Sequence, residues 1–254
     1  MTAQLPAAVL WDMDGTLVDT EPHWSEAQQA LMTDFGLPRL TPEQEEGLVG
    51  SSAHDATRFF RGLGVPLEHD PILVRLNEHV ADLVARELAW RPGAVELLRS
   101  VREAGIPTAL VTNSDRSIVD AVLAWLPEGL FTTIVTSNDV RRGKPEPEPF
   151  LLAAERLGVE PGDCVVIEDS PTGLRAAVAA GCAAIGVPHG AMLDPDGPHT
   201  QFDSLAGVTL DMLREVAARH ATVVAATAEA SAPAAAPAAA SDRTAPTKAE
   251  RTTA

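Results

Sequence analysis

Five short apolar runs constrain the fold of this chain more than any other feature. Each run is largely apolar throughout rather than alternating with polar residues, as expected of strands that are covered on both faces of a sheet. Segments with the apolar spacing of helices separate the runs, and this alternation is typical of βαβ units with a parallel sheet. The runs lie at residues 7–11, 108–112, 132–136, 164–168 and 183–187. The sequence therefore predicts an α/β fold with a Rossmann-like, doubly wound parallel sheet.

The region between the first and second runs contains only helical patterns. We expect residues 19–89 to form an inserted, all-helical domain, and residues 1–18 and 90–220 to form the α/β core. Residues 188–203 are expected to form a loop. From residue 221 to 254 the chain is rich in Ala, Thr and Pro and has little to bury, which predicts a disordered tail.

The charge of the chain excludes some classes of partner. Lys and Arg number 19 against 36 Asp and Glu, a net charge of −17, and such a surface repels nucleic acid phosphates and anionic lipids. The early sequence has no basic segment followed by a long apolar core, so we expect no signal peptide and no membrane helix. Cys164 and Cys182 lie in apolar surroundings and are predicted to be reduced core residues. We therefore expect a cytoplasmic monomer that acts on a small molecule.

Two carboxylates end the first apolar run, one residue apart. Asp12 and Asp14 follow this run, and Gly15 and Thr16 come next. A solvated acidic turn has the same composition, since Asp and Gly are ordinary turn residues. However, two anions this close repel each other unless a cation or a shared proton relieves the repulsion. The glycine also allows a phosphate to approach the backbone closely.

Polar groups also follow the other runs, at the same edge of the predicted sheet. Ligands of open parallel sheets bind outside the carboxyl ends of the strands. Each group alone would fit a structural role, such as a surface lysine or an acid pair at a helix N-terminus. Together, carboxylates suit Mg²⁺. A hydroxyl, an amide or backbone N–H of Asn113, and an ammonium suit phosphoryl oxygens. The groups are Thr112 and Asn113, Lys144, and Glu168 and Asp169. They predict a magnesium-dependent site for phosphoryl transfer.

On these motifs, the chain from about residue 6 to 187 resembles the haloacid dehalogenase superfamily of phosphotransferases. The helical insert resembles the cap of its β-phosphoglucomutase-like group. The resemblance implies that Asp12 is a nucleophile that forms an aspartyl-phosphate, and that Asp14 acts as general acid and then as general base. It implies that Mg²⁺ is held by Asp12, the backbone carbonyl of Asp14 and Asp169, with Glu168 in or next to the coordination shell. The groups implied to bind the phosphoryl group are Gly15, Thr112, Asn113 and Lys144.

Several functions remain open on this scaffold. A phosphatase for a small phosphorylated metabolite, a sugar phosphate, fits the full set of motifs and a cap that excludes water; phosphoglycolate is an alternative substrate. A phosphomutase grips a second phosphate with a cap arginine, and Ala53 stands at that position here, although Arg58 or Arg61 could substitute. A dehalogenase needs no acid at the position of Asp14, and a non-catalytic binding protein needs no intact set of acids with Lys144. The motifs therefore favour the phosphatase.

The cap is expected to supply further substrate contacts. Glycine and hydroxyl groups can approach sugar oxygens, although a packed histidine and a helix break with a serine N-cap would give the same pattern. The candidates are Glu21, His23, Gly50, Ser51 and Ser52. Residues 19–20 and 89–92 are expected to be hinges for cap closure. His189 and His199 are interpreted as surface residues.

Overall fold

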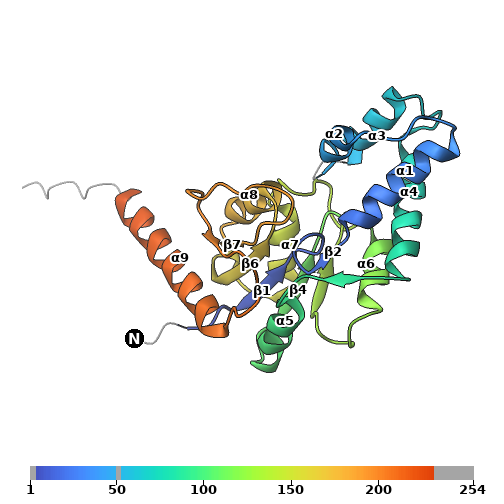
Figure 1. The fold of residues 1–254 in the computed structure, drawn as a ribbon. Coiled ribbons are helices and arrows are strands. Elements are labelled where there is room, and N and C mark those ends of the chain that lie inside the picture. Colours follow the sequence, from blue (N-terminus) through green and yellow to red (C-terminus); the bar gives the residue numbers. More distant parts are fainter. Residues whose placement is uncertain (1–3, 50–52, 232–254) are drawn as a thin grey trace, which may run out of the picture.

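A six-stranded parallel sheet forms the centre of the structure (Figure 1). This computed structural model describes residues 4–49 and 53–231. The strands lie in the order β5-β4-β1-β6-β7-β8, and every neighbouring pair is parallel. Their bounds are β1 (Ala8–Trp11), β4 (Thr108–Val111), β5 (Thr133–Val135), β6 (Cys164–Glu168), β7 (Ala183–Gly186) and β8 (Thr200–Gln201). The predicted α/β fold is confirmed, with the first apolar run at the centre of the sheet.

Alternate residues of the central strands face opposite sides of the sheet, and helices cover both sides. Val9 and Trp11 belong to one hydrophobic cluster, whereas Ala8 and Leu10 belong to the other. Burial on both faces explains why the strands are apolar throughout. The first cluster includes residues of α5 (Ala94–Glu103), α6 (Arg116–Leu123) and α9 (Leu210–Ser231), and the second those of α7 (Glu148–Leu157) and α8 (Pro171–Ala179).

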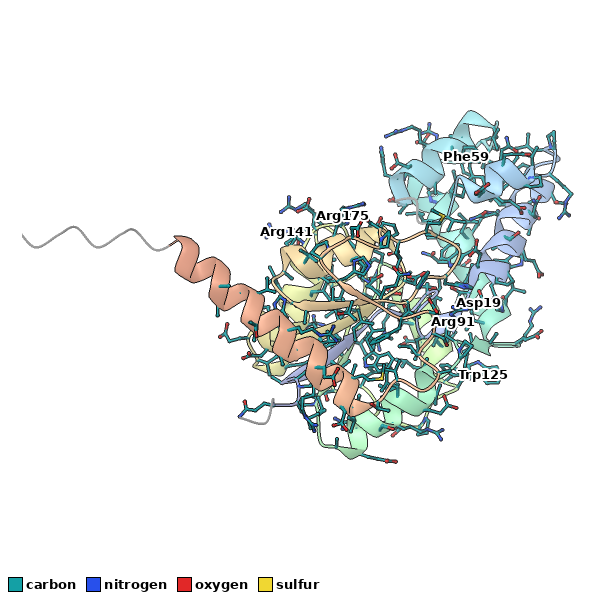
Figure 2. All side chains as sticks on the ribbon, turned by 60° about the vertical axis from the view of Figure 1, so that its left-hand side comes forward. Asp19, Phe59, Arg91, Trp125, Arg141 and Arg175 are labelled. Atoms are coloured by element: carbon teal, nitrogen blue, oxygen red, sulfur yellow. The ribbon has the colours of Figure 1, made fainter. Side chains whose placement is uncertain are left out.

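Helices form the inserted segment, and a short ribbon joins them to the core. The chain enters through β2 (Val18–Asp19) and returns through β3 (Ala89–Trp90), which pair antiparallel. Figure 2 shows Asp19 at this junction and Phe59 in the far part of the cap. The helices are α1 (Glu21–Asp34), α2 (Pro42–Glu46), α3 (Ala53–Gly62) and α4 (His69–Val84). The ends of the predicted helical segment, residues 19 and 89, therefore lie opposite each other in the ribbon.

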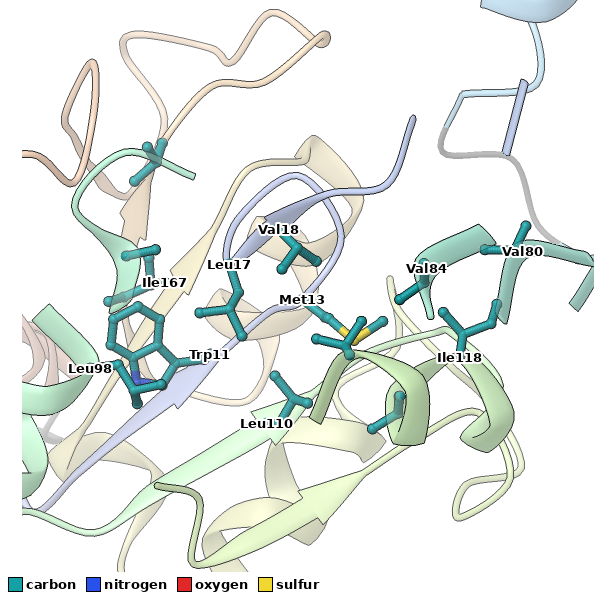
Figure 3. Close-up of a cluster of buried hydrophobic side chains, with 14 of the residues drawn as sticks. Trp11, Met13, Leu17, Val18, Val80, Val84, Leu98, Leu110, Ile118 and Ile167 are labelled. Atoms are coloured by element: carbon teal, nitrogen blue, oxygen red, sulfur yellow. The ribbon is translucent and has the colours of Figure 1, made fainter. Parts of the chain in front are cut away.

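One stripe of α4 holds the cap together. Ile72, Leu76, Val80 and Val84 recur every fourth residue and are all buried. Figure 3 shows Val80 and Val84 beside Ile118 of α6, in the same buried cluster as the first residues after β1. The helix therefore packs against the core as well as against the cap.

Two segments differ from the sequence prediction. Thr200–Gln201 form β8 inside the predicted loop at 188–203, because a strand of two residues gives no periodic signal. Helix α9 continues to Ser231, so the predicted start of the tail at residue 221 lies inside a helix. Residues 221–231 are rich in Ala, the best helix former, and contain no Pro or Gly. Residues 232–254 lie outside the described part of the chain.

The helices that the structure describes include none with both the length and the apolar character needed to cross a bilayer. Both cysteines are buried and free, as predicted: Cys164 begins β6, and Cys182 precedes β7. Burial raises the pKa of each thiol to about 12. Both thiols therefore stay protonated near neutral pH and act as small core residues.

Candidate active site

Lys144 and two carboxylates form a buried ion-pair cluster at the carboxyl edge of the sheet. Its Nζ donates to Asp12 Oδ1 at 2.5 Å and to Glu168 Oε1 at 2.6 Å. A third hydrogen bond goes to the carbonyl oxygen of Val111 at 2.7 Å, and Nζ lies 5.1 Å from the centre of the Phe150 ring. Because these acceptors come from the ends of β1, β4 and β6, three neighbouring strands converge on one ammonium.

Burial makes the carboxyl groups of Asp12 and Asp169 hard to ionise. It raises the pKa of Asp12 to about 7, with the charge of Glu168 adding to the effect and that of Lys144 opposing it. Burial and the charges of Asp12 and Glu168 raise the pKa of Asp169 to about 9. Burial also lowers the pKa of Lys144, but its two carboxylate partners outweigh this and raise the pKa above its ordinary value. The lysine therefore stays charged, and it is the one ammonium beside the three carboxyl groups of Asp12, Glu168 and Asp169 in the described part of the chain.

Three carboxylates lie close enough together to hold one cation. One oxygen from each of Asp12, Glu168 and Asp169 lies within 4.8 Å of the others. Oδ2 of Asp12 is buried and has no hydrogen-bond partner within the part of the chain that the structure describes. Gly15 leaves room for Asp169, because a Cβ on Gly15 would lie 2.1 Å from its Oδ2. An all-oxygen donor set with an unpartnered buried oxygen fits a hard divalent cation.

Three hydroxyl groups fix the carboxylate of Asp14. Thr20 donates to its Oδ1 at 2.5 Å, and Ser114 and Thr112 donate to its Oδ2 at 2.7 and 3.1 Å. Thr112, which the sequence assigns to the phosphoryl group, thus uses its hydroxyl proton on Asp14. Sequence reasoning missed Thr20 and Ser114, whose only signal is a hydroxyl shortly after β2 and β4. The Asp14 carboxylate is therefore held between the hinge and the end of β4.

The side chain of Asn113 fixes the loop that carries Lys144. Its Oδ1 accepts the backbone N–H of Lys144 at 2.9 Å, and its Nδ2 donates to the carbonyl oxygen of Lys144 at 3.1 Å. Gly143 permits this contact, because a Cβ there would lie 2.5 Å from Asn113 Oδ1. The side-chain amide of Asn113, which the sequence assigns to a phosphate, is therefore engaged by the backbone of Lys144 instead.

The candidate substrate contacts of the cap divide into three cases. Glu21 lies against the loop after β7, where its Oε2 would be 3.1 Å from a Cβ on Gly190. His23 Nε2 lies 2.9 Å from the carbonyl oxygen of Glu87, so this ring links the start of α1 to the segment after α4. The remaining candidates, Gly50, Ser51 and Ser52, lie outside the described residues.

The loop after β7 adds a residue that the sequence analysis treats as surface. His189 Nε2 lies 3.1 Å from Asp19 Oδ1, and the ring would be 3.3 Å from a Cβ on Gly15. His199 is also packed, with its ring against Gly186 and a buried Nε2. Both histidines are half-buried rather than fully on the surface, and a loop rich in Pro and Gly has no periodicity that separates buried from exposed positions.

Gly173 gives the Glu168 carboxylate its space. A Cβ at this position would lie 1.8 Å from Glu168 Oε1, so Gly173→Ala should displace the carboxylate from Lys144. We expect the free energy of unfolding in urea to fall by about 1–3 kcal/mol. Gly62→Ala is the matched control, since its added Cβ meets no atom within 4 Å and should be neutral or slightly stabilising. Equal losses in both variants would contradict this packing argument.

Comparisons with known proteins point to one family of hydrolases. The family model for haloacid dehalogenase-like hydrolases matches residues 6–181. This range includes the acidic cluster, which consists of Asp12, Glu168 and Asp169. Hexitol phosphatase A from Escherichia coli is 36% identical over 181 residues, covering 70% of this chain and 81% of that protein. Phosphoglycolate phosphatase 1 from Pseudomonas aeruginosa is 32% identical over 215 residues, covering 80% and 78%. The crystal structure of CbbY from Rhodobacter sphaeroides in complex with phosphate matches with a TM-score of 0.74 at 30% identity, covering 80% of this chain and 96% of that one.

Proposed function

This chain belongs to the haloacid dehalogenase-like hydrolase family, and on that premise we propose that its acidic cluster hydrolyses the phosphate ester of a small polyol or sugar with Mg²⁺. Its relatives are named phosphatases, and the chain is a phosphoric monoester hydrolase. The observation that carries the proposal is the unpartnered, buried Oδ2 of Asp12 beside a charged lysine. A carboxylate oxygen without a hydrogen bond in such a site is suited to nucleophilic attack.

We propose a reaction in two halves, with Asp12 as nucleophile and Asp14 as proton carrier. In the first half, Asp12 Oδ2 attacks phosphorus, the ester P–O bond breaks, and Asp14 gives its proton to the leaving oxygen. In the second half, Asp14 takes a proton from water, whose oxygen attacks the aspartyl-phosphate. The bond to Asp12 then breaks, and inorganic phosphate leaves. The three hydroxyls around Asp14 support this role, because they orient its carboxylate.

Several groups would hold the phosphoryl charge. Asp12, Glu168, Asp169 and the backbone carbonyl of Asp14 are proposed to hold Mg²⁺, which when bound neutralises charge on the phosphoryl oxygens. The three hydrogen bonds of Lys144 are used within the protein, so it would act through its charge. Candidate donors to the phosphoryl oxygens are the backbone N–H groups beside Gly15 and at Asn113, since the side chain of Asn113 is engaged.

Charge at the rim favours a polyhydroxylated ester over phosphoglycolate. We infer that Asp19, Glu21 and His189 lie at the rim of the site, because His189 lies near Gly15 and Asp19, and Glu21 lies near Gly190. Carboxylates accept hydrogen bonds from hydroxyl groups but repel a second carboxylate such as that of glycolate. A phosphorylated hexitol or sugar is therefore the favoured substrate class.

The cap offers little support for a phosphomutase. Ala53, at the position of the mutase arginine, begins α3. Arg58 pairs with Asp55 at 3.3 Å, and Arg61 pairs with Glu68 at 3.2 Å, all on exposed side chains of the cap. Because each arginine already has a carboxylate partner, we regard a grip on a second phosphate as the less favoured reading.

Phosphate release from a panel of esters tests the proposed function. With Mg²⁺ present, hexitol and sugar phosphates should release inorganic phosphate faster than phosphoglycolate does, and EDTA should stop the reaction. Conversion of a hexose 1-phosphate to its isomer without free phosphate would show a mutase instead. Absence of turnover on the whole panel would support a non-catalytic protein.

Glu21→Gln should shift the preference among these substrates. Removing one negative charge at the rim weakens the repulsion of glycolate, and we expect kcat/KM for phosphoglycolate to rise about 3- to 10-fold relative to a hexitol phosphate. Glu26→Gln, on the exposed side of the same helix, is the control and should leave the ratio unchanged. A ratio that stays constant in both variants would place Glu21 away from the substrate.

Stability should depend on Mg²⁺ more strongly at high pH than at low pH. Burial raises the pKa of Asp12 from 3.8 to about 7 and that of Asp169 to about 9. A carboxyl group whose pKa is higher in the folded state than in the unfolded state stabilises the fold fully at pH values below its unfolded pKa. This contribution to stability is lost as the pH rises through its folded pKa. The metal-free protein should therefore lose stability between about pH 4 and pH 9.

Because ligands bind Mg²⁺ in their ionised form, the ion should offset this loss. At saturating Mg²⁺ we expect the melting temperature to rise by about 5–10 °C near pH 8 and by much less near pH 5.5. Calorimetry with and without EDTA measures both shifts, and Ca²⁺ and Na⁺ serve as ion controls. A shift that is equal at the two pH values would contradict binding to these carboxylates.

Localisation and oligomeric state stay predictions. The free, buried Cys164 and Cys182 are consistent with the reducing cytoplasm that the sequence suggests. Size-exclusion chromatography with light scattering would test the predicted monomer.

A further inference from the structure

A second pocket lies beside the hinge and shares no lining residue with the acidic cluster. It has a volume of about 390 Å³. The hinge strand β3, the segment after it, helix α5 and the segment after α6 supply its walls. Figure 2 shows Arg91 and Trp125 close together below Asp19. The charged and aromatic lining residues are Trp90, Arg91, Glu96, Arg99 and Trp125.

The residues that line this hinge pocket carry a net positive charge. Among the ion pairs of the described residues, none involves Arg91 or Arg99. Arg91 is half-buried, and its Nε is buried without a hydrogen-bond partner. A partly desolvated guanidinium without a partner is unfavourable. Glu96 is acidic, so two arginines leave the pocket with a positive charge on a chain of net charge −17.

Two tryptophans line the same pocket. Trp125 is 46% exposed, and its Nε1 donates to the carbonyl oxygen of Val84 at 3.0 Å, which fixes the ring at the end of α4. Trp90 is half-buried in β3. Exposed indole faces that are held in place suit stacking against a planar ring, and guanidinium groups suit phosphate or carboxylate oxygens.

We propose that the hinge pocket binds a nucleotide-sized anion with a planar ring. The ring would lie against Trp90 and Trp125, and the phosphate would pair with Arg91 and Arg99. The volume is within the range of about 300–1,000 Å³ that small-molecule sites occupy. Since Trp90 is part of the hinge ribbon, the ligand contacts the segment that joins the cap to the core.

Titration with 3′,5′-cyclic AMP, followed by tryptophan fluorescence in metal-free buffer, tests this site. The probe is a phosphodiester, so it is not a substrate for phosphomonoester hydrolysis. We expect saturable quenching, and binding of adenosine or inorganic phosphate that is weaker by at least about tenfold. Equal binding of adenosine, or no saturable signal with the unaltered protein, would overturn the proposal.

Two variants locate the binding. Arg99→Glu, at an exposed position of α5, should weaken binding by about tenfold or more, and Trp125→Phe should remove most of the quenching. Arg175→Glu makes the same charge change at an exposed position of α8, outside the pocket, and should bind like the unaltered protein. Equal weakening by Arg99→Glu and Arg175→Glu would show a general charge effect and overturn the site.

Discussion

Replacing Asp12 by asparagine is expected to lower turnover of the phosphate ester by at least about 10⁴-fold. The reason is that Asp12 Oδ1 is held by Lys144, so that Oδ2 is the oxygen left for attack, and an amide is a far weaker nucleophile than a carboxylate. Phosphate release with Mg²⁺ measures the loss. Acid quenching with a radiolabelled ester should trap label on the unaltered protein and none on Asp12→Asn.

Asp120→Asn is the matched control for this change. Asp120 lies on the exposed face of α6 and pairs with Arg116 at 2.7 Å, so its loss should change turnover by less than about twofold. The melting temperature of both variants shows whether they are folded. A folded Asp12→Asn variant that retains turnover, or that still carries trapped label, would refute the proposed nucleophile.

Lys144→Met should have the second large effect, on stability as well as activity. The substitution leaves Asp12 and Glu168 buried without their shared ammonium, and breaking a buried ion pair from one side lowers stability by about 3–5 kcal/mol. Urea unfolding in EDTA measures this loss. Turnover should fall by about 10²–10³-fold, because one charge that stabilises the transition state is gone.

Mg²⁺ should recover part of the stability of Lys144→Met, since it supplies positive charge to the same carboxylates. Arg156→Met is the control, because Arg156 pairs with Asp139 at 2.7 Å but its side chain is 36% exposed. Such a pair contributes about 1 kcal/mol or less. If Lys144→Met loses no more stability than Arg156→Met, the buried cluster is not held by its lysine.

The sequence predicted the α/β fold because burial of a strand on both faces leaves a strong apolar pattern. Strands covered on both faces are apolar throughout, and β6 lies at Cys164–Glu168, as predicted. The rule that polar residues follow the strands of a parallel sheet placed Asp12, Lys144 and Glu168 at one edge, where they do meet. Fold and principal site follow from one cause, the convergence of strand ends.

The remainder of the site depends on contacts that leave no pattern in sequence. Thr20 and Ser114 reach Asp14 from chain positions 6 and 100 residues away, and a single hydroxyl has no periodicity. His189 reaches Asp19 across 170 residues from an irregular loop. Asn113 has the predicted position, but its amide serves the backbone of Lys144. Such roles are decided by tertiary geometry rather than by residue type.

The basic residues of the chain have one further consequence. Lys144 is the sole lysine within residues 4–49 and 53–231, and the other lysine of the sequence is Lys248. Reagents that acylate primary amines attack the uncharged form, which the carboxylates beside Lys144 suppress. Peptide mapping of acylation at this one position over time would therefore measure how often the buried surroundings of Lys144 open to solvent. No other lysine in the described part of the chain adds background.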